Sequence, residues 1–462
     1  MKKICALLIA AMMLLTACTA QPGSSTAGSS GRTDAPETSG GTETAESTES
    51  VPETEPPILN EIIVWTFSGE EERTKTLCEY YIGRPQLTVP VPEGGWTVTV
   101  KTVAPEDLIS RMTEATDTSF SEGVLPDIEE MPDLFFFYSD DFDVLQQAGM
   151  LSPVPETAAE ALGKKIVPSA LAAASAGSTV SAYPAALNNT LLLYYDKNVV
   201  SETGDLASVI GQCEEKSLGF YVGSETTPFS ATMFLSCGLT YAPVVLPDGR
   251  VKQVNCDYYT EKGLKAAKLM QVLMSRDGFR AVEGSPVLAF SDLQSQAGAM
   301  IADSYQTAEI KTQLGDNCGV AALPPVSDGT AEIPLLSRGT FTLIGVAPKK
   351  DDAKRELCHL LAEELVSVGA QRARFEAGGA VPVRESLLKE DMLADNETAS
   401  ALAAQMPNVI RKIRVSPGYY GAMESFAAKL LAGGADMKTA KLQQLLDELS
   451  AFLMAEAAKE QE

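Results

Sequence analysis

The chain has 462 residues, of which 45% are hydrophobic, and its 62 acidic against 36 basic side chains give a formal net charge of −26. A single hydrophobic core stops growing well below this length, so we expect two domains or more. The acidic balance argues against nucleic acid and anionic membrane surfaces as partners of the folded body.

The amino terminus has the features of an export signal. Lys2 and Lys3 precede the apolar stretch Ile4–Leu15, which is too short to cross a membrane as a helix. Leu15-Thr16-Ala17-Cys18 follows and resembles a bacterial lipobox. We therefore predict a signal peptide over residues 1–17, a lipidated Cys18, and anchoring to the outer face of the bacterial cytoplasmic membrane. The alternative is a plain secretory signal with a chance cysteine.

Residues 18–57 are rich in Ser, Thr, Gly, Pro and Glu and contain almost nothing to bury, which predicts a disordered tether. Six cysteines remain beyond it. Export permits disulfides and the even number leaves many pairings open. We expect most of these thiols to be buried as small apolar groups. The six are Cys78, Cys213, Cys237, Cys256, Cys318 and Cys358.

Strands and helices alternate from Ile58 onward. This order predicts a parallel sheet with right-handed crossovers. The predicted strands are Ile62–Phe67, Thr97–Val103 and Leu134–Tyr138, and the predicted helices begin near Glu70, Pro105 and Val144.

The segment Ser181–Val200 separates this pattern from a second one. Pro184 pushes Tyr183 toward an extended conformation. Leu191–Tyr195 is an apolar run without alternation, which is typical of a strand buried on both faces of a parallel sheet. We interpret the segment as a crossing between two lobes with a ligand between them. An ordinary buried strand after a turn is the alternative.

The α/β pattern continues to the end of the chain. Further strands are predicted at Leu218–Val222, Gly298–Tyr305, Cys318–Pro324 and Thr340–Pro348; helices are predicted at Leu264–Leu273, at Asp351–Phe375 as one strong helix, at Met423–Leu431 and at Leu442–Leu453.

Seven short motifs, in this order, resemble those of bacterial solute-binding proteins in the maltose and multiple-sugar branch. The resemblance covers nearly all of Ile58–Leu453. Each motif is weak alone, and their order carries the resemblance. They are Val64–Phe67, Pro132–Phe137, Gly149–Leu151, Tyr183-Pro184, Gly298–Tyr305, Gly319–Pro324 and Gly378–Arg384.

The resemblance implies an α/β fold with two lobes, the periplasmic-binding-protein-like fold of type II. The lobes would be discontinuous, with residues 58–184 and about 343–391 in the first and 185–342 and about 392–462 in the second. Tyr183 and Pro184 would form the hinge. The implied function is a monomeric receptor that captures a mono- or oligosaccharide and delivers it to the permease subunits of an ABC importer.

Candidate ligand-binding residues follow the carboxyl ends of strands, where ligands of parallel α/β sheets bind. Trp65, Phe67 and Ser68 follow the first strand, and Phe137 and Asp140 follow the third. The resemblance implies that Asp140 accepts hydroxyl hydrogen bonds and that Phe137 stacks on the ligand. Core packing of the rings and helix capping by Asp140 are the alternatives.

On the other side of the expected cleft, the resemblance points to Asn188, Phe229, Tyr305 and Tyr420. The two tyrosines stand near positions that hold tryptophans in the family. Because the chain has two tryptophans, Trp65 and Trp96, we expect a smaller or more polar solute than a long oligosaccharide. Packing is the alternative role for the tyrosines.

No catalytic or metal motif stands out, so we predict no enzyme activity, cofactor or metal. His359 is the single histidine, and we expect it on the surface, off the apolar stripe of its helix. Asp140, Asp141 and Asp143 lack the spacing of a calcium loop. Three alternatives stay open: the same fold binding a peptide, a polyamine or another polar solute, with Glu70 among the acids that favour a cation; a surface lipoprotein for interaction instead of transport; and an exported hydrolase.

Overall fold

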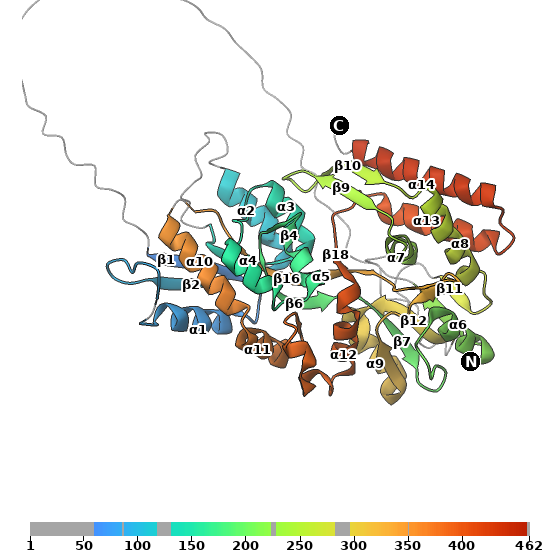
Figure 1. Cartoon of the computed structure of the whole chain (residues 1–462), viewed down its shortest axis with the longest axis horizontal. Helices are drawn as coiled ribbons and strands as arrows, with labels where there is room; N and C mark the ends of the chain where they lie inside the picture. The colour runs from blue at the N-terminus through green and yellow to red at the C-terminus, as the bar shows by residue number, and fades with distance from the viewer. Residues whose placement is uncertain are drawn as a thin grey trace, which may run out of the picture. The chain divides into compact units, whose positions relative to one another are not determined.

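The computed structural model describes residues 60–85, 87–117, 131–222, 228–281, 296–349 and 351–459. Within these ranges the chain forms two larger β-sheets, each with helices packed on it (Figure 1). The predicted signal peptide, Cys18 and the tether lie outside the described residues. Among the described helices, none combines the length and the apolar character needed to cross a membrane.

The first sheet has the strand order β17-β6-β16-β3-β1-β2, and β18 pairs with β16. β1 is parallel to β2 and β3, whereas β16 is antiparallel to β3 and β6. The strands are β1 (Glu61–Thr66), β2 (Thr97–Thr102), β3 (Leu134–Tyr138), β6 (Tyr183–Asn189), β16 (Ser337–Val346), β17 (Val381–Pro382) and β18 (Val409–Arg411). The helices of this region are α1 (Glu71–Ile82), α2 (Leu108–Asp117), α3 (Phe142–Gln147), α4 (Glu156–Gly163), α5 (Pro168–Ala173), α10 (Asp352–Leu365) and α11 (Val368–Gly378).

The second sheet has the order β11-β8-β12-β7-β13. β8 is parallel to β11 and β12, whereas β7 is antiparallel to β12 and β13. The strands are β7 (Leu191–Asp196), β8 (Gly219–Val222), β11 (Phe279–Ala281), β12 (Ala297–Asp303) and β13 (Cys318–Ala321). The helices are α6 (Leu206–Glu215), α7 (Phe229–Ser236), α8 (Glu261–Met274), α9 (Thr307–Leu314), α12 (Glu397–Gln405), α13 (Tyr419–Gly433) and α14 (Thr439–Lys459).

Short elements complete the fold. Three two-stranded hairpins are β4 (Ser175–Ala176) with β5 (Thr179–Val180), β9 (Tyr241–Val245) with β10 (Val251–Cys256), and β14 (Val326–Ser327) with β15 (Glu332–Ile333). The 3₁₀ turns are η1 (Pro105–Asp107), η2 (Ser139–Asp141), η4 (Ser304–Gln306), η5 (Gly315–Asn317), η6 (Leu387–Lys389), η7 (Asp391–Leu393) and η8 (Met406–Asn408).

The prediction that Leu191–Tyr195 lies in a parallel sheet is wrong in direction, although the strand itself is present as β7. Leu191, Leu192, Leu193 and Tyr194 are buried, as the apolar run predicts. Both neighbours of β7 are antiparallel to it. Burial on both faces produces an unbroken apolar run whichever way the neighbours point, so hydrophobicity alone does not carry strand direction.

The crossings between the sheets fall at other residues than expected. β6 belongs to the first sheet and β7 to the second, which places the first crossing at Thr190. Tyr183 and Pro184 therefore lie inside a strand of the first sheet instead of at a hinge. β16 and β18 also pair in the first sheet, although Ser337–Thr342 and Val409–Arg411 were expected in the second lobe. The Tyr-Pro dipeptide lies at the start of β6, and the crossing to the second sheet follows at the end of the same strand.

The single helix predicted over Asp351–Phe375 is two helices. α10 ends at Leu365, and α11 begins at Val368. Ser367 stands between them, and its side chain accepts a hydrogen bond from the Ala370 amide at 3.2 Å. Serine is a strong N-cap because its oxygen satisfies an amide that has no partner within the helix. This hydrogen bond starts a new helix at Val368, although the apolar stripe continues through the break and predicts a single helix.

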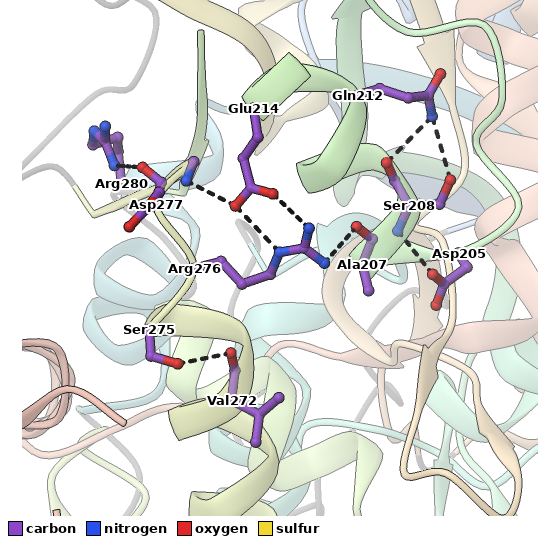
Figure 2. A network of polar contacts seen from close by, with 11 residues as sticks. Asp205, Ala207, Ser208, Gln212, Glu214, Val272, Ser275, Arg276, Asp277 and Arg280 are labelled. Carbon is purple, nitrogen blue, oxygen red and sulfur yellow. Dashed lines mark hydrogen bonds and ion pairs between the residues drawn. The ribbon is translucent and has the colours of Figure 1, made fainter. Parts of the chain in front are cut away.

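A network of polar contacts holds the edge strand β11 of the second sheet in place (Figure 2). Glu214, near the end of α6, receives Arg276 Nε at 3.2 Å and Nη2 at 2.5 Å and the Gly278 amide at 3.0 Å. Arg276 Nη1 donates to the Ala207 carbonyl at 3.0 Å. Hydrogen bonds from Arg276 lower the pKa of Glu214. The turn from α8 into β11 is thereby held against both ends of α6.

His359 lies in the core, which corrects the expectation of a surface residue. Its side chain is 4% exposed, and Nδ1 lies 3.0 Å from the Tyr183 hydroxyl. The helical pattern misleads here because α10 packs against α1 as well as against β6 and β16, so its buried face is wider than one apolar stripe. A polar residue beside the stripe is therefore covered too.

We expect this histidine to destabilise the protein in mild acid. Burial lowers the pKa of His359 to about 4, and the Arg355 charge adds to the effect. An unfolded chain binds the proton with a pKa near 6.5. The unfolded state then binds more protons between these values, so the stabilisation is complete above about pH 6.5 and is lost as pH falls toward 4. From this group alone, the free energy of unfolding should be about 2 kcal/mol lower at pH 5 than at pH 7.

Chemical denaturation at both pH values checks this expectation. His359→Gln keeps a hydrogen-bonding side chain beside Tyr183 but does not titrate, so its loss of stability in acid should be smaller by that amount. An equal loss in the wild type and in the variant would contradict the assignment.

All six cysteines of the described ranges are free thiols, and five of them are buried. Burial raises their pKa values, to about 12 for Cys78 and Cys213 and to about 11 for Cys256. Cys237 is half-buried, and its pKa is raised for the same reason. The expectation that most of these residues pack as small apolar groups is confirmed.

Candidate functional site

The carboxyl ends of strands from the two sheets meet at the first crossing, where Asn189 joins them. Its side-chain oxygen accepts hydrogen bonds from Ser304 Oγ at 2.8 Å and from the Tyr305 amide at 3.3 Å. Its amide nitrogen donates to Asp303 at 3.1 Å. The last residue of β6 is therefore bound to the end of β12 and to the turn η4 that follows it.

The second crossing runs beside the first. Thr190 Oγ1 and Ser337 Oγ lie 2.6 Å apart at the start of β16. Gly339, two residues later, packs so closely that a Cβ there would lie 2.8 Å from the Asn189 carbonyl and 2.4 Å from a methyl of Val409. The strands β6, β16 and β18 thus converge on a position that only glycine fits.

Three ion pairs tie the third crossing to the turn after β3. The basic residues follow one another at the end of β18, and the acidic residues lie in η2 and α3. Arg411 also stacks on Phe142, with 4.3 Å from the guanidinium carbon to the ring centre. Burial raises the pKa of Asp141, and the Arg414 charge opposes this shift. The pairs are Arg411–Asp143 at 2.6 Å, Lys412–Asp140 at 3.5 Å and Arg414–Asp141 at 2.5 Å.

Asp140 and Asn188, two predicted site residues, both bind the central strand β16. Asp140 Oδ1 accepts a hydrogen bond from Thr340 at 2.9 Å, and Asn188 Oδ1 accepts one from Thr342 at 2.6 Å. α3, which begins at Phe142, has no side-chain cap bond. The alternative role of Asp140 as a helix cap is therefore not what the structure shows.

The predicted aromatic residues of the first sheet divide into two groups. Trp65 is 5% exposed and Phe137 is fully buried, and both belong to the core. Phe67 is half-buried and packs on Tyr138 with ring centres 4.7 Å apart. Ser68 is exposed. The partly accessible ring surface on this side is the Phe67–Tyr138 pair, in which Tyr138 stands directly after the buried run of β3.

On the second side, Tyr420 is the predicted aromatic residue whose surroundings fit a site. Burial raises its pKa, and the charges of Asp140 and Asp303 raise it further. Tyr420 lines a hollow together with Lys412, which is the ion-pair partner of Asp140. Phe229 is buried and packs on Phe279 at 5.7 Å between ring centres. Tyr305 is 53% exposed.

A small hollow lies beside Tyr420 and contains two cations that were not among the predicted residues, Arg338 and Lys412. Its volume of about 20 Å³ has room for roughly one water molecule. Lys412 follows the short strand β18, which the sequence pattern does not predict, and Arg338 lies inside β16, so neither cation is singled out by the sequence. The lining residues are Pro228, Ala231, Arg338, Lys412, Ile413, Val415, Tyr419 and Tyr420.

A larger surface hollow of about 470 Å³ lies between α13 and α14, but it shares no lining residue with the group around Tyr420. None of the predicted site residues lines it. Within the described part of the chain, no group of three or more His, Cys, Asp or Glu side chains is placed to hold a metal ion. The arrangement at the crossings offers hydrogen-bond acceptors, donors and ring faces, which suits reversible binding of a polar molecule.

Comparisons with known proteins agree with this geometry. Residues 93–401 match the family model described as bacterial extracellular solute-binding protein. A search of curated proteins found no match. Among solved structures, the ligand-free maltodextrin-binding protein MalE1 of L. casei BL23 is 16% identical, with a TM-score of 0.63, over 85% of this chain and 98% of that one.

Two further structures resemble the chain in the same way. A cyclo/maltodextrin-binding protein complexed with maltotetraose is 14% identical, with a TM-score of 0.63, over 87% of this chain and 98% of that one. An extracellular solute-binding protein of Staphylococcus aureus in complex with maltose is 14% identical, with a TM-score of 0.59, over the same shares of 87% and 98%. At these identities the likeness establishes the two-lobe fold.

Proposed function

Because this chain belongs to the family of bacterial extracellular solute-binding proteins, we propose that it captures a carbohydrate at the crossings between its two sheets and delivers it to an ABC importer. The observation that carries the proposal is the meeting of strand ends from both sheets around Asn189, Asp140 and Tyr420. A solute bound there contacts both lobes at once, which couples binding to their closure.

The side chains at this place suit a sugar. Sugars need flat apolar surfaces for their C–H faces and a few fixed polar groups for their hydroxyls. The Phe67–Tyr138 pair and Tyr420 supply rings. Asp140 and Asn188 supply oxygens that β16 holds in place. The ligands of similar structures, maltose and maltotetraose, support the same class of solute.

The structure weakens the alternative of a cationic ligand. That reading depended on free carboxylates at Glu70, Asp140 and Asp141, and each of them has a basic partner within ion-pair distance. A cation would have to displace an internal one, at the cost of leaving a partly buried charge unpaired. The partners are Arg73 and Arg374 for Glu70, Lys412 for Asp140 and Arg414 for Asp141.

The proposal includes the remaining features of such a receptor. Membership of an extracellular family means that the protein is exported. We propose that the lipid on Cys18 holds it at the membrane, that one copy binds one solute, and that the permease subunits are its protein partners. Binding without chemistry is its expected activity, in keeping with the binding proteins among the similar structures.

Titration calorimetry with maltose, maltotriose and monosaccharides tests the proposal, together with thermal unfolding. A saccharide at a hundred times its Kd stabilises the fold by roughly 2.7 kcal/mol, which raises the midpoint by a few degrees. Tyr420→Ala should weaken binding about tenfold, because it removes one ring face. Tyr80→Ala is the control, since Tyr80 is 65% exposed on α1. Absence of heat and of any midpoint shift with every saccharide would sink the proposal.

A further inference from the structure

Arg338, the second residue of β16, is a partly buried cation without a carboxylate partner among the described residues. Its Nη1 donates to the Arg411 carbonyl at 2.9 Å. Burial lowers its pKa, which reports a charge held away from water. Two other sheltered arginines differ from it. Arg374 lies 3.1 Å from Glu70, and Arg411 lies 2.6 Å from Asp143. Sheltered charges in proteins are normally paired. The carboxylate whose charge acts on Arg338 is Asp143, and Asp143 already forms an ion pair with Arg411.

The surroundings of Arg338 point the same way. It lines the small hollow with Lys412, whose charge is shared with Asp140 at 3.5 Å. Tyr419 and Tyr420 line the same hollow, with ring centres 5.4 Å apart and an edge-to-face arrangement. The space of about 20 Å³ matches a water-sized group, such as one carboxylate oxygen, and excludes a sugar ring.

We propose that Arg338 binds the carboxylate of the solute, and that the solute is an acidic sugar with a uronic acid unit whose ring lies outside the hollow against Tyr420. The proposal rests on the carbohydrate-receptor function proposed above and specifies its ligand class. A charge-assisted hydrogen bond from a guanidinium to one carboxylate oxygen is short and strong, so it contributes both affinity and orientation. Acidic peptides and amino acids carry the same group, so the test must separate them from sugars.

The ligand side of the test uses the full-length protein and four probes: digalacturonate, its methyl ester, maltose, and a glutamate dipeptide. The ester keeps the rings but removes the charge. We expect digalacturonate to bind about ten to a hundred times more tightly than its ester, because a hydrogen bond to a charged partner is strong where water is excluded. Equal affinity for the acid and the ester would overturn the proposal, as would exclusive binding of the dipeptide.

The protein side uses Arg338→Gln, with Arg250→Gln as the matched control. Arg250→Gln removes the same charge, but from an exposed ion pair with Asp248 on the β9–β10 hairpin. Arg338→Gln should abolish the preference for the acid over the ester, and Arg338→Lys should restore part of it. The control should keep the full preference. If Arg338→Gln does not fold, the affinities of the wild-type protein for digalacturonate and for its methyl ester still test the proposal.

Failure of this inference is distinguishable from failure of the proposed function. Binding of maltose with no preference for the acid, and with equal affinity in Arg338→Gln, would remove Arg338 as a carboxylate site and leave the receptor function intact. Absence of binding by every saccharide probe would overturn both.

Discussion

Replacement of Asp133 by alanine is expected to lower the free energy of unfolding by about 3 to 5 kcal/mol. This carboxylate is buried at the start of β3, where one oxygen accepts the Ile63 amide at 2.7 Å. The other oxygen lies 3.0 Å from the ammonium groups of both Lys349 and Lys354. Without it, two sheltered lysines face each other with no counter-charge, and a buried amide loses its acceptor.

Urea denaturation of Asp133→Ala and Asp133→Asn measures this loss. Asparagine keeps an acceptor for Ile63 but not the charge, so it should recover only part of the stability. Asp248→Ala is the control, because its pair with Arg250 is about half exposed and contributes less than roughly 1 kcal/mol. If the free energy of unfolding falls no more for Asp133→Ala than for Asp248→Ala, water must solvate the two lysines in place of the carboxylate, and the prediction is wrong.

Gly339→Ala is expected to cost about 3 kcal/mol, at the upper end of what overpacking usually costs. The added methyl would lie 2.8 Å from the Asn189 carbonyl, a backbone atom, and 2.4 Å from Val409. Strands β6, β16 and β18 must then separate at the crossings. Solute binding should weaken together with stability, because Asn189 connects the two sheets.

A second glycine provides the comparison for this prediction. Gly369 in α11 has nothing within 4 Å of the position of a Cβ. Gly369→Ala should leave the urea midpoint unchanged or raise it slightly, since alanine favours the helix. Equal midpoints for the two variants would mean that the crossings yield to a methyl group without strain.

Much of the fold could be predicted from the sequence where burial alone decides. Leu134–Tyr138 is a strand with the predicted bounds, because five apolar residues before a polar turn leave little choice. The directions of β7 and β16, and the membership of β18 in the first sheet, depend on contacts between distant segments. No local sequence pattern indicates strand direction or sheet membership. The resemblance of scattered motifs places the crossing between the sheets only to within one strand.

The candidate site stays a prediction, and the structure divides its predicted residues into two groups. Asp140 and Asn188 each bind β16, whereas Tyr420 lies on the helix α13, and the role of all three in binding stays a prediction. Phe137 and Phe229 are buried in the two cores, because an aromatic residue at a strand end faces either the ligand or the core and its identity does not tell which. Arg338 and Asn189 escaped notice since their roles arise from partners far away in the chain.

The free thiols have a consequence for where this receptor can work. An exported protein meets oxidants that form disulfides, yet the thiolate is the form that reacts. Burial holds the pKa of Cys78 and Cys213 at about 12, so these groups stay protonated and shielded at neutral pH. Within the described ranges no disulfide links the strands and helices, so their packing needs no oxidant. We therefore expect the described part of the fold to be insensitive to the redox state of its compartment.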